Sequence, residues 1–159
     1  MTDAASTWDS APWRRVRDAN LLRWMLGNDD AVKTIVMLSA ISETWDALID
    51  GDAVTSDEVH GAFISATISL NLNPFYKQWE PMITGAALAG LNAWMDSIAL
   101  EKSESIPERM QAFYIRNYIY ELVNVCAFAV GGWAHMRSVS QEMRAFFTHE
   151  TYSQREHAK

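Results

Sequence analysis

The sequence is poor in the residues that form disulfides and turns. It has one cysteine, four prolines and seven glycines among 159 residues. A single cysteine excludes an intramolecular disulfide, so nothing indicates an oxidising compartment. Cys126 lies in an apolar run, which favours a buried, unreactive thiol. The scarcity of proline and glycine disfavours a turn-rich all-β fold.

Basic residues are also scarce, and they are unevenly placed. The formal net charge of −7 argues against a general nucleic-acid binder. No Lys or Arg lies between Lys33 and Lys77, although that stretch holds six acidic residues: Glu43, Asp46, Asp50, Asp52, Asp57 and Glu58. Positive charge gathers earlier, in Arg14, Arg15, Arg17 and Arg23. Such segregation suits head-to-tail or partner contacts, and the alternative interpretation is a solvated acidic face.

Signals for membrane insertion or export are absent. The longest apolar run, residues 110–133, contains Arg116, Glu121 and Asn124, and charges near the middle of a membrane helix are costly. The first residues are acidic and polar, without the basic and apolar regions of a signal peptide. We therefore expect neither a membrane span nor a cleaved leader.

Helical periodicity dominates the rest of the sequence. No segment alternates with period 2 between turn signals, so the sequence predicts an all-α fold. We expect a compact single-domain bundle of about six helices, at about residues 12–26, 30–50, 56–70, 81–101, 107–130 and 139–155. The helix over 107–130 is apolar nearly all round and should lie at the centre. The domain would span residues 11–156, between a flexible arm (1–10) and a frayed tail (157–159).

Local signals set the predicted helix ends. Asp29 can cap the second helix, Gly51 can end it, and Thr55 with Glu58 forms a capping box. Two more capping boxes are predicted, Ser105 with Glu108 and Ser138 with Gln141. Asn73 can act as a cap, and Pro81 as a helix start. Gly131-Gly132 predicts a kink or a turn, and the small residues from Gly85 to Gly90 would let another helix approach closely. The third helix should turn four residues inward: Val59, Phe63, Ala66 and Leu70.

Motifs that carry catalysis are missing. The chain has no Glu-x-x-His pair for a di-metal bundle, no Gly-x-Ser-x-Gly elbow and no phosphate-binding loop. Glu43-x-x-Asp46 matches half of the magnesium-binding pattern of all-α nucleotide pyrophosphohydrolases. No Glu-x-x-Glu precedes it, and a solvated helix face produces the same spacing. We expect no catalytic residue, no metal ligand and no cofactor, and so a protein that is not an enzyme.

Two groups of residues are candidate sites. The candidate interaction residues are Trp13, Arg14, Arg17, Trp24, Glu43, Asp46 and Asp50. Tryptophan is enriched at interfaces, although the alternative for each Trp is a core anchor. Glu121 and Asn124 lie one turn apart in apolar surroundings, where a carboxylate needs a partner. Glu121 must therefore keep its proton or pair with a group such as an arginine. Arg14, Arg15, Arg17 or Arg23 of the first helix would serve as that partner. The pair could form a buried network that fixes helix register, a polar pocket or self-association contact, or an exposed group.

Three stretches carry a resemblance to known proteins: Glu43-Thr44-Trp45-Asp46-Ala47-Leu48-Ile49-Asp50-Gly51-Asp52, Asn73-Pro74-Phe75-Tyr76, and Val130-Gly131-Gly132-Trp133. Together they resemble small uncharacterised helical proteins encoded by tailed bacteriophages. The resemblance implies a viral origin and a place in the host cytoplasm or the virion. It implies no activity and carries over no catalytic residue.

These observations favour a non-enzymatic protein-interaction module, phage-encoded and oligomeric. It would be a virion component or a host-protein binder, and its partner would be itself or a host or phage protein, not nucleic acid or a membrane. The first alternative is an acidic inhibitor of a host or defence enzyme, acting through the face of residues 43–58. The second is a magnesium-dependent all-α hydrolase that uses Glu43 and Asp46.

Overall fold

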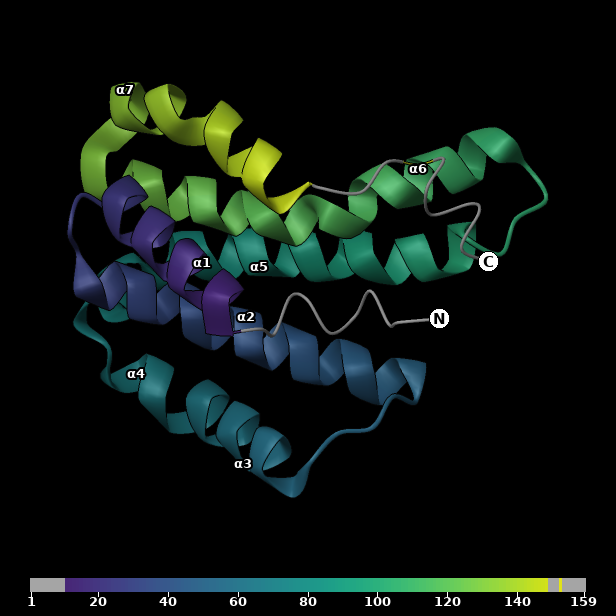
Figure 1. Cartoon of the computed structure of the whole chain (residues 1–159), viewed down its shortest axis with the longest axis horizontal. Coiled ribbons are helices and arrows are strands. Elements are labelled where there is room, and N and C mark those ends of the chain that lie inside the picture. The colour runs from purple at the N-terminus through teal and green to yellow at the C-terminus, as the bar shows by residue number, and fades with distance from the viewer. Residues whose placement is uncertain (1–10, 149–151, 153–159) are drawn as a thin grey trace. The chain divides into compact units, whose positions relative to one another are not determined.

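The computed structural model describes residues 11–148 and Tyr152. Its elements are α1 (Ala11–Trp24), α2 (Asp29–Asp50), α3 (Ser56–Ile64), a π-helix (Ser65–Ser69), α4 (Leu70–Leu72), α5 (Pro74–Leu100), α6 (Ile106–Arg116), a 3-10 helix (Asn117–Tyr120) and α7 (Glu121–Phe147) (Figure 1). No strand occurs in these residues, which confirms the predicted all-α class. The predicted arm (1–10) and tail (157–159) lie outside the described residues.

The chain divides into two compact units, one up to Gln78 and one from Trp79 on. The division falls inside α5, which runs through it without a break. The sequence-based expectation of a single domain over residues 11–156 therefore stays a prediction.

In the first unit, α1 packs on α2, and α2 also packs on α3 and the π-helix. Leu21, Trp24 and Met25 are buried, as are Ala31 and Ile35 of α2. The cap of α2 differs from the prediction. The Asn28 side chain, not that of Asp29, accepts a hydrogen bond from the Ala31 amide (2.9 Å). Asp29 is the first helical residue, where its charge favours the helix dipole.

The predicted ends on either side of the α2–α3 connection are confirmed. Gly51 stops α2 in the left-handed conformation (φ 77°). Thr55 Oγ1 accepts from the Glu58 amide (3.2 Å), and the Thr55 amide donates to Glu58 Oε2 (2.7 Å). Thr55 Oγ1 also donates to Glu58 Oε2 (2.7 Å). The two bonds that this oxygen accepts, first the one from the backbone amide, lower the pKa of Glu58 because they favour its charged form. The capping box is thus retained above the ordinary pKa of a glutamate and lost as the pH falls through the lowered one.

The third predicted helix continues to Leu72, but a π turn interrupts it. A π turn adds one residue, which rotates the following residues by about 100° relative to a regular helix. The predicted inward face is therefore wrong for three of its four residues. Val59, Phe63 and Ala66 are exposed, whereas Leu70, after the π turn, is buried.

Asn73 is a cap as predicted, since its Oδ1 accepts from the Tyr76 amide (3.0 Å). The segment that it caps is the long helix α5 and not a short turn. The predicted helix start at Pro81 is wrong, because α5 already begins at Pro74 and holds Pro81 inside. Proline fits the first helical turn, but an interior proline leaves the carbonyl four residues earlier without its helical donor. Here the helix continues past that missing bond.

In the second unit, α5 approaches the 3-10 helix closely at Gly90. A β-carbon built at Gly90 would lie 2.9 Å from the Ile119 α-carbon. This confirms close approach at one end of the predicted small-residue face. At Gly85, on the same helix, an added β-carbon meets nothing within 4 Å. Gly90 is therefore needed for close helix packing, whereas Gly85 is not, although both lie on α5.

We expect Gly90→Ala to destabilise the protein and Gly85→Ala to stabilise it. Overpacking against a backbone costs about 1–3 kcal/mol, which outweighs the gain of up to about 1 kcal/mol when alanine replaces glycine in a helix. Gly85→Ala receives that gain without a clash. Urea unfolding followed by far-UV circular dichroism measures both. Equal stabilisation by the two variants would contradict the close approach.

The predicted central helix is not continuous. Its start is confirmed at Ile106, although Ser105 makes no side-chain cap bond and the predicted box is not formed. The α-helix ends at Arg116, and a 3-10 turn follows before α7 begins at Glu121. Its apolar character still marks a buried region, since six of its residues are core: Ala112, Phe113, Leu122, Val123, Cys126 and Ala127.

α7 is a helical hairpin. Gly132 (φ 74°, ψ −174°) breaks it into two arms, and the second arm folds back along the first (Figure 1). This confirms the kink or turn predicted at the paired glycines. The predicted restart near residue 139 is wrong because the helix resumes at Trp133. Ser138 is therefore an interior residue, and its hydroxyl donates to the His135 carbonyl (2.7 Å).

Candidate functional site

An open groove lies in the first unit, between α2 and the segment that joins the π-helix to α5. Its volume is about 610 Å³. Ten residues line it: Asp18, Asp30, Val32, Lys33, Val36, Met37, Ser69, Leu72, Asn73 and Pro74. Half of them are apolar, and the charged groups are Asp18, Asp30 and Lys33. A groove lined by these residues suits an apolar segment held by a few polar contacts.

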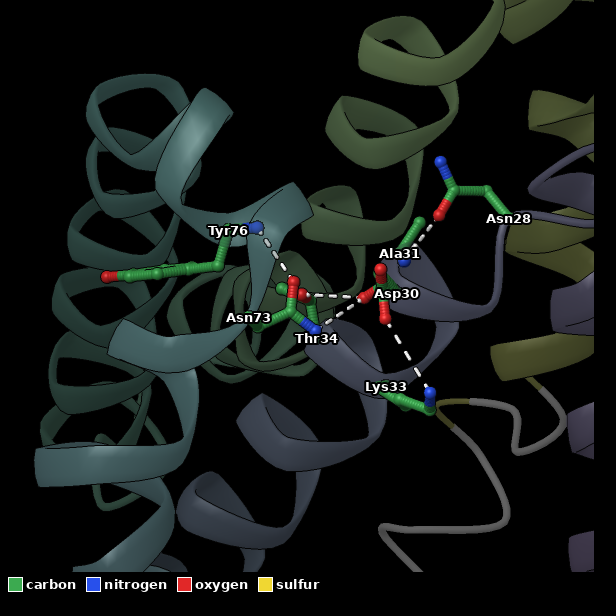
Figure 2. A network of polar contacts seen from close by, with 7 residues as sticks. All are labelled: Asn28, Asp30, Ala31, Lys33, Thr34, Asn73 and Tyr76. Atoms are coloured by element: carbon green, nitrogen blue, oxygen red, sulfur yellow. Dashed lines mark hydrogen bonds and ion pairs between the residues drawn. The ribbon is translucent and has the colours of Figure 1, made fainter.

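A polar network fixes one wall of the groove (Figure 2). The Asp30 carbonyl accepts from Asn73 Nδ2 (3.0 Å) and from Thr34 Oγ1 (2.9 Å). Asn73 Oδ1 meanwhile caps α5 through the Tyr76 amide. Because Asn73 and Thr34 are buried, these bonds tie the start of α5 to the first turn of α2. The side-chain amide of Asn73 and the hydroxyl of Thr34 are engaged in these hydrogen bonds within the fold. The role of the network is therefore to position the wall of the groove.

The apolar wall of the groove continues along the neighbouring helix. Leu72 lines the groove and is 69% exposed. Ile68 and Ile64 precede it at intervals of four residues and are 53% and 49% exposed. Phe63 lies beside them and is 67% exposed. We call these four residues, Phe63, Ile64, Ile68 and Leu72, the α3–α4 face.

The hydrophobic period of the sequence did not indicate the α3–α4 face, because it placed Phe63 and Leu70 on one inward side. The π turn lies between them, and Phe63 is exposed, as Ile64 is, whereas Leu70 is buried. Inserted turns of this kind are frequent at functional sites. The available signal was Ile64, Ile68 and Leu72 at spacing four, a second apolar stripe that one buried face does not need.

The candidate interaction residues of the first helix lie in different environments. Trp24 is fully buried, which fits the alternative of a core anchor. Trp13 is half-buried, and the Arg17 guanidinium carbon lies 5.4 Å from its ring centre. Arg17 Nε also donates to Asp18 Oδ1 (2.9 Å). Arg14 is exposed. An interaction role for Trp13, Arg14 and Arg17 stays a prediction.

The acidic candidates lie on α2. Glu43 and Asp50 are exposed, and Asp46 between them is half-buried. Their spacing puts them on one face of the helix. In the part of the chain that the structure describes, no group of three or more His, Cys, Asp or Glu side chains is placed to hold a metal ion.

Glu121 and Asn124 form a network with a residue that the sequence-based reasoning did not select. Arg144 Nε and Nη2 each donate to one Glu121 carboxylate oxygen at 2.7 Å. Asn124 Nδ2 donates to Glu121 Oε2 (3.1 Å). Asn124 is buried, but the Glu121 side chain is 30% exposed. The partner expected among the arginines of the first helix is therefore wrong, and the pair is only partly buried.

The hairpin explains the choice of Arg144. Glu121 lies eleven residues before Gly132 and Arg144 twelve residues after it, so the reversal brings them opposite each other. The bond to Glu121 raises the pKa of Arg144 because it favours the charged guanidinium. The bidentate pair joins the ends of the two arms, and Asn124 orients the carboxylate. This geometry matches the interpretation of a network that fixes helix register.

We expect the Glu121–Arg144 pair to contribute only modestly to stability. Half-exposed pairs typically give up to about 1 kcal/mol, and salt screens them. A double-mutant cycle with Glu121→Gln and Arg144→Gln, measured by urea unfolding at low and high salt, isolates the coupling. A coupling energy of zero at low salt would show that the contact does not hold the hairpin in solution.

Cys126 is buried, and burial raises the pKa of its thiol to about 12. The predicted buried thiol is thus confirmed. Little of it is present as the reactive thiolate at neutral pH.

No helix in the described ranges is long and apolar enough to cross a membrane. Comparison with family models, curated proteins and solved structures found no match to this chain.

Proposed function

We propose that the chain is a non-enzymatic protein-interaction module that binds through the α3–α4 face. The observation that supports this is the exposure of Phe63, Ile64, Ile68 and Leu72, each about half exposed or more. Isolated apolar side chains are normal on a surface, whereas a contiguous patch marks an interaction site. Because Leu72 belongs to both, the face and the groove form one continuous surface.

The shape of this surface suits a helical partner. An amphipathic helix lays its apolar side into a groove through anchors at intervals of three and four residues. Ile64, Ile68 and Leu72 repeat at that interval, and the groove beside Leu72 can take a side chain at the end of the contact. The buried network around Asn73 holds this wall in place before binding, which limits the ordering cost.

The test compares two leucines that are equally exposed. Leu72 and Leu88 are each 69% exposed, and Leu88 lies on α5 outside the α3–α4 face. We expect Leu72→Asp with Ile68→Asp to abolish association while the melting temperature stays within a few degrees of the wild type. Leu88→Asp should leave association intact. Sedimentation velocity over a concentration series reports self-association, and a host-lysate pull-down reports a foreign partner.

Two results would contradict the proposal. One is a strict monomer that captures nothing from the lysate. The other is an association that survives aspartate at both Ile68 and Leu72, since a buried unpaired charge at an apolar contact is too costly to retain.

An acidic inhibitor is the second candidate, and the exposure of Glu43 and Asp50 favours it. These residues share a face with Asp46 in a stretch without any Lys or Arg, so a basic enzyme site would be the complementary surface. Replacing all three with Ser should abolish inhibition without unfolding the protein. Loss of binding by the Ile68 and Leu72 variants, with the serine variant unaffected, would instead assign the activity to the α3–α4 face.

The proposed origin is a tailed bacteriophage, and the proposed location is the host cytoplasm or the virion. Neighbouring capsid and tail genes would support a virion component, and neighbouring early genes would support a host-protein binder. A chromosomal setting without phage genes would contradict the origin.

A further inference from the structure

We propose that the occupant of the α3–α4 face is α1 of a second copy of this chain. The contact would be head-to-tail, because α1 and the α3–α4 face are different surfaces of the same unit. This inference rests on the proposed function and adds to it the identity of the partner.

α1 presents a surface of the required kind. Arg15 and Leu22 lie seven residues apart, which is two helical turns, and so share one side of the helix. Both are exposed, and Leu26, in the turn that follows, is 60% exposed. Leu21 and Trp24 are buried, so the side of Arg15 and Leu22 is not the one that supplies the core.

The spacing along the two helices matches. Leu22 and Leu26 follow Arg15 by seven and eleven residues, and Ile64 and Ile68 follow Asp57 by the same intervals. Asp57 is exposed in the first turn of α3. A parallel arrangement therefore places Arg15 against Asp57 and Leu22 against Ile64, because the two residues of each chain lie two turns apart within one α-helix. Leu26 follows α1 with φ 52° and Ile68 lies in the π-helix, so these two residues extend the apolar surface without sharing that register. The apolar contacts would supply affinity, and the charge pair would set the register.

Charge complementarity extends beyond this single pair. α1 carries four arginines, Arg14, Arg15, Arg17 and Arg23, whereas residues 34–76 contain no Lys or Arg. Asp50 and Asp52 add negative charge at the connection before Asp57, and both are exposed. A parallel contact between two α3–α4 faces would bring the acidic residues at the start of α3 together, so that contact is disfavoured relative to a contact with α1.

Such a contact uses a different surface on each copy, so a dimer keeps one unused α1 and one unused face, to which further copies can add. It closes into a ring or continues as an open chain of subunits. We therefore expect the average molecular mass to rise with protein concentration. We also expect two variants, each blocked on a different surface, to associate only when they are mixed.

The experiment uses two variants of the full chain, each blocked on one surface. Leu22→Asp blocks α1 and Ile68→Asp blocks the face. Each alone should be monomeric by sedimentation, with a dissociation constant raised by about thirtyfold or more, as for a hot-spot residue. An equimolar mixture should form a heterodimer, because one intact α1 and one intact face remain. Leu88→Asp is the control that should associate like the wild type.

A charge exchange tests the register independently of the apolar residues. Arg15→Glu should weaken association, and Asp57→Arg in the same chain should restore it, whereas Asp57→Arg alone should weaken it. Circular dichroism and melting temperature confirm that each variant is folded. A wild-type chain that stays monomeric at millimolar concentration would overturn the inference.

Two further outcomes separate this inference from the proposed function. If Ile68→Asp abolishes association and Leu22→Asp does not, α1 is not the partner, yet the α3–α4 face still binds. If both variants are folded monomers and their equimolar mixture does not form a dimer, the proposed head-to-tail contact is wrong. If neither substitution affects association, the proposed function and this inference fail together.

Discussion

Replacing Trp24 with alanine is expected to lower the free energy of unfolding by about 3–5 kcal/mol. The side chain is fully buried, as are Leu21 and Met25 close to it in the chain, so its removal leaves a cavity that the surrounding residues can fill only partly. A loss of this size is a large part of the roughly 5–15 kcal/mol that stabilises a typical protein. Urea unfolding followed by far-UV circular dichroism measures it without relying on tryptophan fluorescence.

Trp133→Ala is the matched control. It removes the same side chain from a position that is 66% exposed, where substitutions usually change stability by about 0.5 kcal/mol or less. The comparison also decides between two interpretations of Trp24. If Trp24 is an interface residue, the Trp24→Ala protein should lose association and keep its free energy of unfolding. If Trp24 is a core anchor, the variant should lose stability. Equal stability of the two variants would contradict the burial of Trp24.

The features that sequence analysis predicted correctly are those that depend on neighbours in the chain. The Thr55 capping box, the Gly51 stop and the Asn73 cap each involve residues within a few positions of one another. Their hydrogen bonds join residues within about one helical turn, so composition and spacing indicate them. The Ser105 box has the same spacing and is not formed, so the signal is local but not sufficient. The choice of Asn28 over Asp29 shows the limit of such signals, because two adjacent residues can both cap and packing selects one.

The features that were missed depend on contacts between distant segments. Pro81 breaks a helix in isolation, yet α5 continues through it. The π turn after Ile64 and the 3-10 turn after Arg116 both interrupt segments with uniform apolar character. A hydrophobic period indicates that a helix is amphipathic, but it does not report an extra residue in one turn. The exposure of Phe63 opposite the buried Leu70 follows from that extra residue, whereas the spacing of Ile64, Ile68 and Leu72 was already present in the sequence.

The candidate polar pair shows how one structural fact completes a prediction. Glu121 and Asn124 were identified because a carboxylate in an apolar run needs a partner. Its actual partner, Arg144, follows from the reversal at Gly132 and a count of residues along the two arms. A kink alone would not specify that partner, because the sequence left open whether the chain bends or reverses. The reversal itself is therefore the feature on which this site depends.

We expect Gly132→Ala to destabilise the hairpin by about 1–3 kcal/mol, because its backbone conformation is essentially restricted to glycine. With φ 74° and ψ −174°, an L-alanine is strained by its own backbone. The environment adds no clash, since nothing lies within 4 Å of an added β-carbon. Urea unfolding measures the loss, and a weaker Glu121–Arg144 coupling in the double-mutant cycle would accompany it.

A D-alanine introduced at position 132 by chemical ligation tests the backbone strain, with its methyl group in place of the other α-hydrogen of the glycine. For a D-residue these angles are the mirror image of extended backbone, which is freely allowed, and the added methyl group is the same size. D-alanine should therefore restore the wild-type stability or exceed it by up to about 1 kcal/mol, because it restricts the unfolded chain. If both enantiomers destabilise the protein equally, the side chain and not the backbone is the cause, and the hairpin does not turn at Gly132 in the way described.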